Sequence, residues 1–107
     1  MIRASAGAQI PGILSHQGKV TVNGTNYTGI GQFKFAFVNA AGTVSFWSHD
    51  GTSSDGGQPG SAIALTTARG VFSVNLGDTN YVNMTETIPA AVFTNREVYL
   101  RVWSMTA

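Results

Sequence analysis

The residues able to do acid–base or metal chemistry in this chain are two histidines and five carboxylates. His16 and His49 lie in no cluster with metal-ligand spacing, and because the sequence has no cysteine, a zinc site would need both of them together with carboxylates. Acid–base catalysis by paired carboxylates needs two of them to converge on a substrate. Here the carboxylates are scattered along the chain: Asp50, Asp55, Asp78, Glu86 and Glu97. With no Gly-x-Ser-x-Gly nucleophile motif either, the sequence predicts a protein that is not an enzyme and has no metal and no cofactor.

Asp50 and Asp55 are the two carboxylates nearest each other in the chain. They stand in a glycine-rich stretch at residues 50–57, Asp-Gly-Thr-Ser-Ser-Asp-Gly-Gly, which resembles a calcium-binding loop in part. The stretch lacks the alternating acidic positions and the distal bidentate glutamate of such loops. We therefore expect a plain, exposed glycine-rich loop over residues 50–60, with calcium bound by Asp50 and Asp55 as the alternative.

Large aromatic residues could make contact with a partner or a sugar. Tyr99, Arg101 and Trp103 alternate in the sequence and would share the outward face of a strand, and Trp47 falls on the face opposite Phe46. Such residues are enriched at protein interfaces and stack on flat ligands. Three interpretations stay open, because these side chains could contact another protein or domain, bind a glycan, or be covered by the short helix or the N-terminal arm.

Low charge is the most unusual property of the composition. Only 10% of the 107 residues are charged, and the formal net charge is +1, whereas an average protein is about a quarter charged. This balance rules out a strong electrostatic attraction to nucleic acid or to an anionic membrane. No apolar run approaches the roughly 18 residues that cross a bilayer, so we predict no membrane span.

Apolar and polar residues alternate with a period of two through most of the chain, which predicts β-strands. Phe33, Phe35 and Phe37 share one face of a strand, and the strands are expected over 13–22, 32–38, 43–49, 61–67, 71–76 and 97–104. Asn23-Gly24 predicts a tight turn, and one short helical turn is expected near 88–94. Units of strand, helix and strand, about 30 residues long, are absent from the pattern. We therefore predict an all-β fold, an antiparallel two-sheet β-sandwich of six to eight short strands.

The chain is long enough for one domain, which we place at residues 13–107 behind a flexible or extended arm at residues 1–12. The domain's expected core is Phe33, Phe35, Phe37, Phe46, Phe72, Val74, Leu76, Leu100 and Val102. The arm contains two alanine-x-alanine patterns typical of signal-peptidase sites, without the apolar segment that should precede them. It is either the remnant of a secretory signal or a small-residue arm with chance spacing. Its apolar end, with Ile10, Ile13 and Leu14, could donate a strand to another copy.

Several segments taken together resemble an N-terminal β-sandwich module of secreted bacterial surface and fibre-like proteins. They are residues 17–24, 29–37, 46–48, 70–77, 88–93 and 99–103. The resemblance implies a structural role ahead of fibre-like, collagen-like or tail-fibre-chaperone regions, and it implies no catalytic residues. In the resemblance a further segment able to add another strand follows, whereas this sequence stops at Ala107. Either the polypeptide was trimmed or something else covers the sheet edge, because an exposed edge invites pairing with another chain.

We therefore expect a non-enzymatic, extracellular structural or assembly module, secreted to the bacterial surface. It would be a subunit of a fibre or filament, or the head domain of a surface protein with a part in adhesion. Its partners would be copies of itself or adjacent domains, joined by strand pairing and apolar docking. The alternative is a carbohydrate-binding module that uses Trp47, Tyr99 and Trp103.

Overall fold

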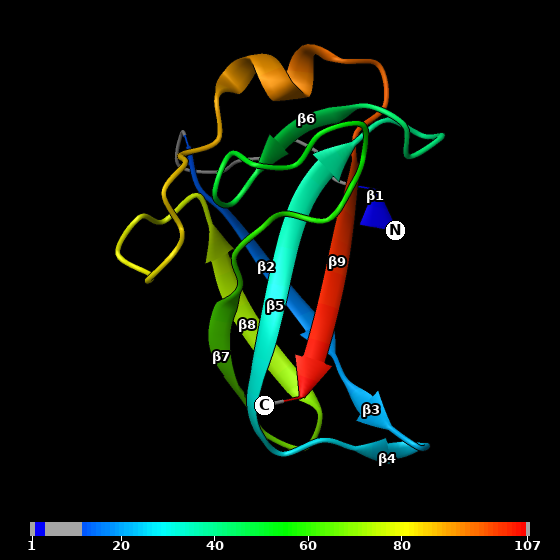
Figure 1. Cartoon of the computed structure of the whole chain (residues 1–107), viewed down its shortest axis with the longest axis vertical. Coiled ribbons are helices and arrows are strands. Elements are labelled where there is room, and N and C mark those ends of the chain that lie inside the picture. Colours follow the sequence, from blue (N-terminus) through cyan, green and yellow to red (C-terminus); the bar gives the residue numbers. More distant parts are fainter. Residues whose placement is uncertain (1, 4–11, 107) are drawn as a thin grey trace.

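The computed structural model describes residues 2–3 and 12–106 (Figure 1). These residues form nine strands and one short 3-10 helix: β1 (Ile2–Arg3), β2 (Leu14–Lys19), β3 (Thr21–Val22), β4 (Thr25–Asn26), β5 (Gly29–Val38), β6 (Ser45–Ser48), β7 (Ile63–Thr67), β8 (Val71–Leu76), η1 (Ala90–Thr94) and β9 (Tyr99–Thr106). The predicted all-β sandwich is confirmed. The helical turn is also found, as η1 with Pro89 just before it in extended conformation.

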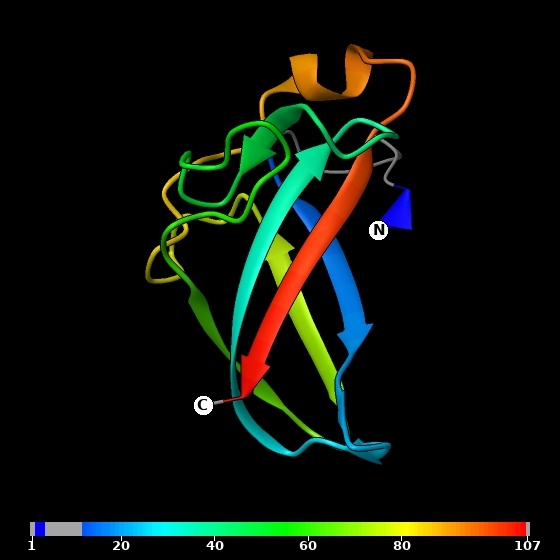
Figure 2. The ribbon, with the colours of Figure 1, turned by 45° about the vertical axis from the view of Figure 1, so that its right-hand side comes forward.

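The long strand β5 is the centre of the larger sheet. One edge of β5 pairs with β9 along Gly31–Val38, and the other edge pairs first with β7 and then with β6. β7 continues through a tight turn into β8, which pairs with β2 in the second sheet. The strands therefore form a belt in the order β9, β5, β7, β8, β2. Figure 2 shows β9 and β5 in front with β2 and β8 behind them.

The core lies between these two layers and is rich in aromatic rings. Phe33, Phe35 and Phe37 project inward from β5, and all three are at most 1% exposed. Phe72 from β8 packs on Phe33, with the ring centroids 4.4 Å apart. Alternation along each strand produces this core, because every second side chain of β5 and β8 points to the same face. Two expected core residues, Phe46 and Val102, are only partly buried and pack against the rim of the core.

Asn23 and Gly24 form the turn between β3 and β4, as the sequence predicts. Both residues have positive φ, 51° for Asn23 and 81° for Gly24. A two-residue hairpin turn of this kind requires positive φ at both positions, and asparagine and glycine tolerate it best.

Trp47 faces inward, contrary to the simple alternation of residues 43–49. β5 and β6 pair Val38 with Ser45 but Phe37 with Trp47, so Phe46 is an extra residue in a β-bulge. The bulge puts Trp47 on the same face as Phe37, and Trp47 is only 7% exposed. The prediction that Trp47 faces outward is therefore wrong, because alternation in sequence does not reveal the inserted residue.

The glycine-rich loop at residues 50–60 does not extend freely into solvent. It folds back over the outer face of β5, where Ala36 and Val38 are fully buried although they point away from the core. Pro59 of the loop is also fully buried, and Gly56 packs so closely on Gly42 that no Cβ would fit there. The end of β5 at residues 36–38 is therefore covered on both faces, and the expectation of a wholly exposed loop is corrected.

Candidate functional site at the open edge of the sandwich

Tyr99, Arg101 and Trp103 share the outward face of β9, as predicted from their spacing. All three are half-buried. The Arg101 guanidinium lies over the Trp103 ring, 5.3 Å from its centroid, a cation–π contact. The structure thus brings these three residues together, while Trp47 lies in the core and does not belong to their face.

The chain's own loop covers part of this face. Arg101 donates a hydrogen bond from Nη1 to the Gly56 carbonyl, at 3.1 Å. On the neighbouring strand, Lys34 donates from Nζ to Gln58 Oε1, at 2.8 Å. The loop therefore covers this face at Arg101 and Lys34, whereas Met105, farther along the same face of β9, is 53% exposed.

Asp50 holds this loop in place through four hydrogen bonds. Its Oδ1 accepts from the backbone N–H and hydroxyl of Thr52, and its Oδ2 accepts from the same two groups of Ser61, at 2.6–3.0 Å. Burial by itself raises the pKa of Asp50, but the hydrogen bonds from Ser61 and Thr52 outweigh it and hold the pKa well below its ordinary range.

These contacts bear on the calcium alternative at Asp50 and Asp55. Both Asp50 oxygens already serve donors of the loop, and Asp55 is exposed at its tip. Within residues 2–3 and 12–106, no group of three or more histidine, cysteine or carboxylate side chains is placed to hold a metal ion. Asp50 therefore stabilises the conformation of the loop by hydrogen bonds to Thr52 and Ser61.

His49 is fully buried beneath the same loop. Its Nδ1 lies 3.2 Å from the Phe35 backbone nitrogen, which donates to it. Its Nε2 lies 3.4 Å from Ser61 Oγ and 4.0 Å from Asp50 Oδ2. The imidazole therefore contacts other buried groups of the fold and has no exposed surface with which to meet a substrate.

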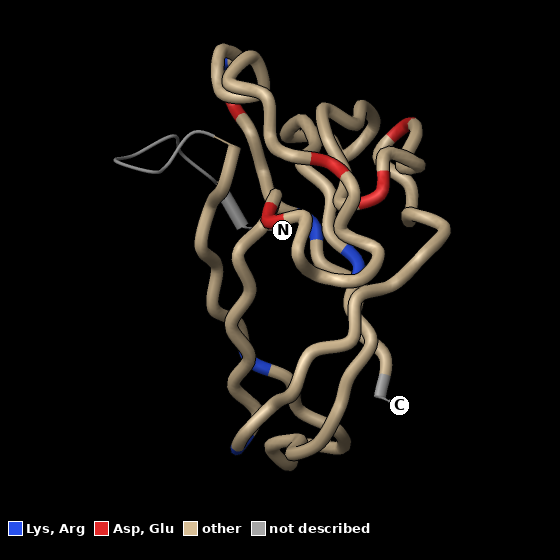
Figure 3. Tube along the Cα trace, turned by 90° about the vertical axis from the view of Figure 1, so that its left-hand side faces the viewer, with Lys and Arg blue, Asp and Glu red and all other residues tan. Residues whose placement is uncertain are grey.

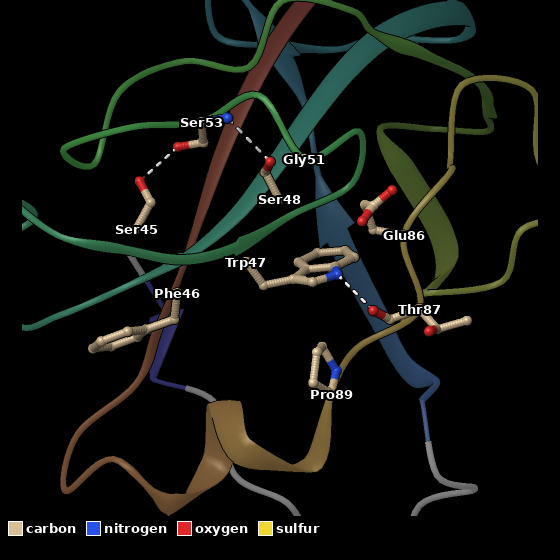
Figure 4. Close-up of a pocket in the computed structure, with 9 residues that line it drawn as sticks. All are labelled: Ser45, Phe46, Trp47, Ser48, Gly51, Ser53, Glu86, Thr87 and Pro89. Carbon is tan, nitrogen blue, oxygen red and sulfur yellow. Dashed lines mark hydrogen bonds between the residues drawn. The ribbon is translucent and has the colours of Figure 1, made fainter.

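A small pocket lies beside Trp47 (Figure 4). Its volume is about 240 Å³, and Trp47 lines it together with Phe46, Pro89 and Glu86. The Trp47 indole N–H donates to the Thr87 carbonyl at 3.1 Å, so it is not free to bind a ligand. Ligand sites are commonly larger, about 300–1,000 Å³.

The outer edge of β9, on the side away from β5, has a strand partner at its first two residues only among the residues that the structure describes. β1 pairs with it in antiparallel fashion, with Ile2 opposite Leu100 and Arg3 opposite Tyr99. Along 101–106 no strand among the described residues pairs with this edge. This edge of β9 can therefore pair with a further strand. Only Tyr99 and Leu100 are paired with β1.

A second feature lies next to this edge, which we call the β2–β9 seam. The name stands for the two strands at the ends of the belt, β2 and β9, with their inward-pointing residues Leu14, His16, Val102 and Ser104. All four point inward, yet Leu14, His16 and Val102 are half-buried and Ser104 is exposed, although Ser104 lies opposite the buried Phe33. Inward-pointing side chains of the seam are therefore partly accessible to solvent.

His16 in the seam has a polar atom that the fold does not satisfy. Its Nε2 is shielded from solvent and has no hydrogen-bond partner within the described part of the chain. Burial lowers the pKa of His16 from its ordinary 6.5. The folded chain therefore favours the neutral imidazole of His16, and protonation of His16 favours the unfolded chain.

His16→Leu should stabilise the domain by about 1 kcal/mol at pH 7, because it removes a shielded, unpaired nitrogen at similar size. The wild type should also lose stability as the pH falls below 6.5, since the unfolded chain takes up the proton first. The variant should lack this component. Urea unfolding from pH 8 to pH 5 measures both effects.

Gln17→Leu is the matched control, because Gln17 is exposed on the other face of β2. It should neither stabilise the domain nor change the pH profile. Equal profiles for His16→Leu and the wild type would show that His16 is not responsible for the acid sensitivity.

The fold and its open edge define a small antiparallel β-sandwich whose belt does not close. Residues 15–106 match the model of a family described as a domain of unknown function (DUF8740), and the chain belongs to that family. No curated protein and no solved structure matches the chain. Among the residues described, no helix is long and apolar enough to cross a membrane.

The structure also places the predicted strand donor. Leu14 is the first residue of β2 and pairs with Leu76 of the same chain, and Ile13 is half-buried just before it. Ile10 lies outside the described residues. Ile2 and Arg3, which the sequence-based prediction passes over, are the residues that occupy the β9 edge.

Proposed function

We propose that this chain is a non-enzymatic structural module that associates with copies of itself, or with adjacent domains, through strand pairing at the edge of β9. Its place of action is extracellular, as a subunit of a fibre or filament or as a domain of a bacterial surface protein. The observation that carries the proposal is the edge of β9 along 101–106, unpaired within the described chain, beside a seam that exposes the rim of the core.

Low charge along the edges supports self-association. Proteins that avoid edge-to-edge pairing place charged residues, above all lysine, on their edge strands. Beyond Arg101, whose guanidinium is held by the loop, the exposed end of β9 has no charged residue. In Figure 3 the acidic segments lie in the half of the molecule that carries η1, away from the C-terminal end of β9.

Ser104→Lys should weaken self-association, raising the apparent dissociation constant at least about tenfold. The lysine would place a charge at an inward-pointing but exposed position of the open edge, from which its long side chain can reach solvent. Light scattering of the full chain over a range of concentrations measures the mass, and electron microscopy shows whether filaments form.

Thr66→Lys is the matched control. It adds the same charge at an exposed position on β7, in the same sheet but away from the β9 edge. It should associate like the wild type. A wild-type mass that stays at 11.2 kDa at every concentration, or equal effects of the two lysines, would refute association through this edge.

Carbohydrate binding, the alternative expected from the sequence, stays a prediction. The positions of its three aromatic residues do not favour it, because Trp47 is separated from the face that Tyr99 and Trp103 share.

A further inference from the structure

We propose that the β2–β9 seam is filled in the assembled protein by residues 2–10 of a second copy, which run antiparallel to β9. This inference rests on the proposed self-association and names the segment that carries it. Four features of the chain support it: the strand already on the edge, the pattern of the N-terminal sequence, the register, and the charges.

The edge of β9 already binds this segment in one place. Ile2 lies opposite Leu100 and Arg3 opposite Tyr99, so the backbone of the N-terminal segment is an antiparallel partner that this edge accepts. The two main sheets depend on their long strands, which are β5 and β9 in one sheet and β2 and β8 in the other. β1 is joined to its sheet by two residues only and can leave it without opening the core.

The N-terminal sequence has the pattern of a strand with one buried face. From Ile2 to Ile10 the even positions are all apolar, and the odd positions carry arginine, serine, glycine and glutamine, as the sequence Ile-Arg-Ala-Ser-Ala-Gly-Ala-Gln-Ile shows. Strict alternation over such a length is typical of a half-buried strand. Nine extended residues would span about 30 Å, enough for the eight residues of β9.

The register of β1 is fixed at the start of β9. With Ile2 opposite Leu100 and Arg3 opposite Tyr99, the two described residues of β1 pair with the first two residues of β9 and not with 101–106. Gly12 is fixed elsewhere, since its carbonyl accepts from the Ile88 N–H at 3.0 Å. A second copy has no such constraint and can place the segment along the whole edge.

The faces also match. Even-numbered residues of β9 point inward, and Ile2 pairs with the even-numbered Leu100, so a shift by an even number of residues keeps the apolar side of the segment toward the core. Pairing Ile2 with Thr106 is one such shift. It places Ala4 opposite Ser104, Ala6 opposite Val102 and the neutral Gly7 opposite Arg101, so no like charges meet directly.

Because the chain has no cysteine, a cross-link can test this pairing between molecules. Chains carrying Ala4→Cys are mixed with chains carrying Ser104→Cys and treated with a short bismaleimide. We expect a cross-linked heterodimer at a yield at least about tenfold above the control, because residues opposite each other in an antiparallel ladder lie about 4.5–5.5 Å apart.

Val82→Cys replaces Ser104→Cys in the control mixture, because Val82 is 82% exposed and reports random collisions. A heterodimer yield no higher than this control overturns the inference. So does a double variant, Ala4→Cys with Ser104→Cys, that cross-links only within one chain at all concentrations.

A charge placed on each face of the segment gives a second test that needs no cross-linker. Ala6→Lys puts a charge on the side that faces the core and should raise the apparent dissociation constant at least about tenfold. Ser5→Lys puts it on the outer side and should change this constant less than about twofold.

The two tests separate the proposals. If the chain associates and Ser104→Lys blocks association, while Ala6→Lys and Ser5→Lys behave alike, the proposed function stands and the N-terminal segment is not the strand that fills the seam. If the chain is a monomer throughout, both proposals fail.

Discussion

Phe35→Ala should lower the free energy of unfolding by about 3–5 kcal/mol, the range typical of a large aromatic removed from a core. Phe35 has no exposed surface. Its ring lies 6.3 Å from that of Phe33 and 6.4 Å from those of Phe72 and His49. Because Phe33 and Phe72 belong to different sheets and His49 is fixed beneath the loop, these neighbours cannot collapse into the cavity together, and the cost should fall in the upper part of the range.

Urea unfolding followed by circular dichroism measures this loss. Phe46→Ala is the matched control, since Phe46 is only half-buried at the bulge and should cost clearly less. An equal cost at the two positions would contradict the assignment of Phe35 to the centre of the core.

Asp50→Ala should lower the free energy of unfolding by about 3 kcal/mol at pH 7. The change removes four hydrogen bonds to a carboxylate whose side chain is 9% exposed. Because water can reach this partly exposed position and satisfy some of the donors, the expected loss is that of one or two hydrogen bonds to a charged group, at about 1.5–3 kcal/mol each. It also leaves the backbone N–H groups of Thr52 and Ser61 without their acceptor. The loop over β5 should loosen, and amide hydrogen exchange at Ala36 and Val38 should become faster.

The pH dependence of this loss has a definite sign. The pKa of Asp50 is lower in the folded chain than its ordinary 3.8, so its contribution is present above pH 3.8 and is lost as the pH falls below it. The difference between the wild type and Asp50→Ala should therefore shrink in acid. Asp55→Ala, at the exposed tip of the same loop, should cost less than about 0.5 kcal/mol. If Asp55→Ala lowered the free energy of unfolding as much as Asp50→Ala, loss of the charge would explain the effect better than loss of the hydrogen bonds to Thr52 and Ser61.

Alternation predicts the strands well because each buried strand has one face that must be apolar. The triplet Phe33, Phe35 and Phe37 is such a case, and its prediction as core is confirmed. Alternation predicts the wrong face for Trp47. One inserted residue, Phe46, reverses the faces beyond it, and no local pattern records the insertion because it depends on the partner strand.

The candidate site was predictable only in part. The common face of Tyr99, Arg101 and Trp103 follows from their spacing, but its partial cover by the glycine-rich loop comes from contacts between residues far apart in sequence. The β2–β9 seam has no sequence signal at all. It exists because β2 and β9 are the two ends of the belt, a property of the order of all the strands.

That order of strands has a consequence for how the chain folds. Phe35 in the first half of the chain pairs with Val102 near its C-terminal end, so the long central ladder closes a very large loop. Closing such loops makes folding slow, because the chain loses entropy before the contacts form. During synthesis β5 leaves the ribosome long before β9, and the edge of β5 that pairs with β9 stays open until β9 follows. The nascent chain should therefore be most prone to aggregation in the interval before β9 emerges.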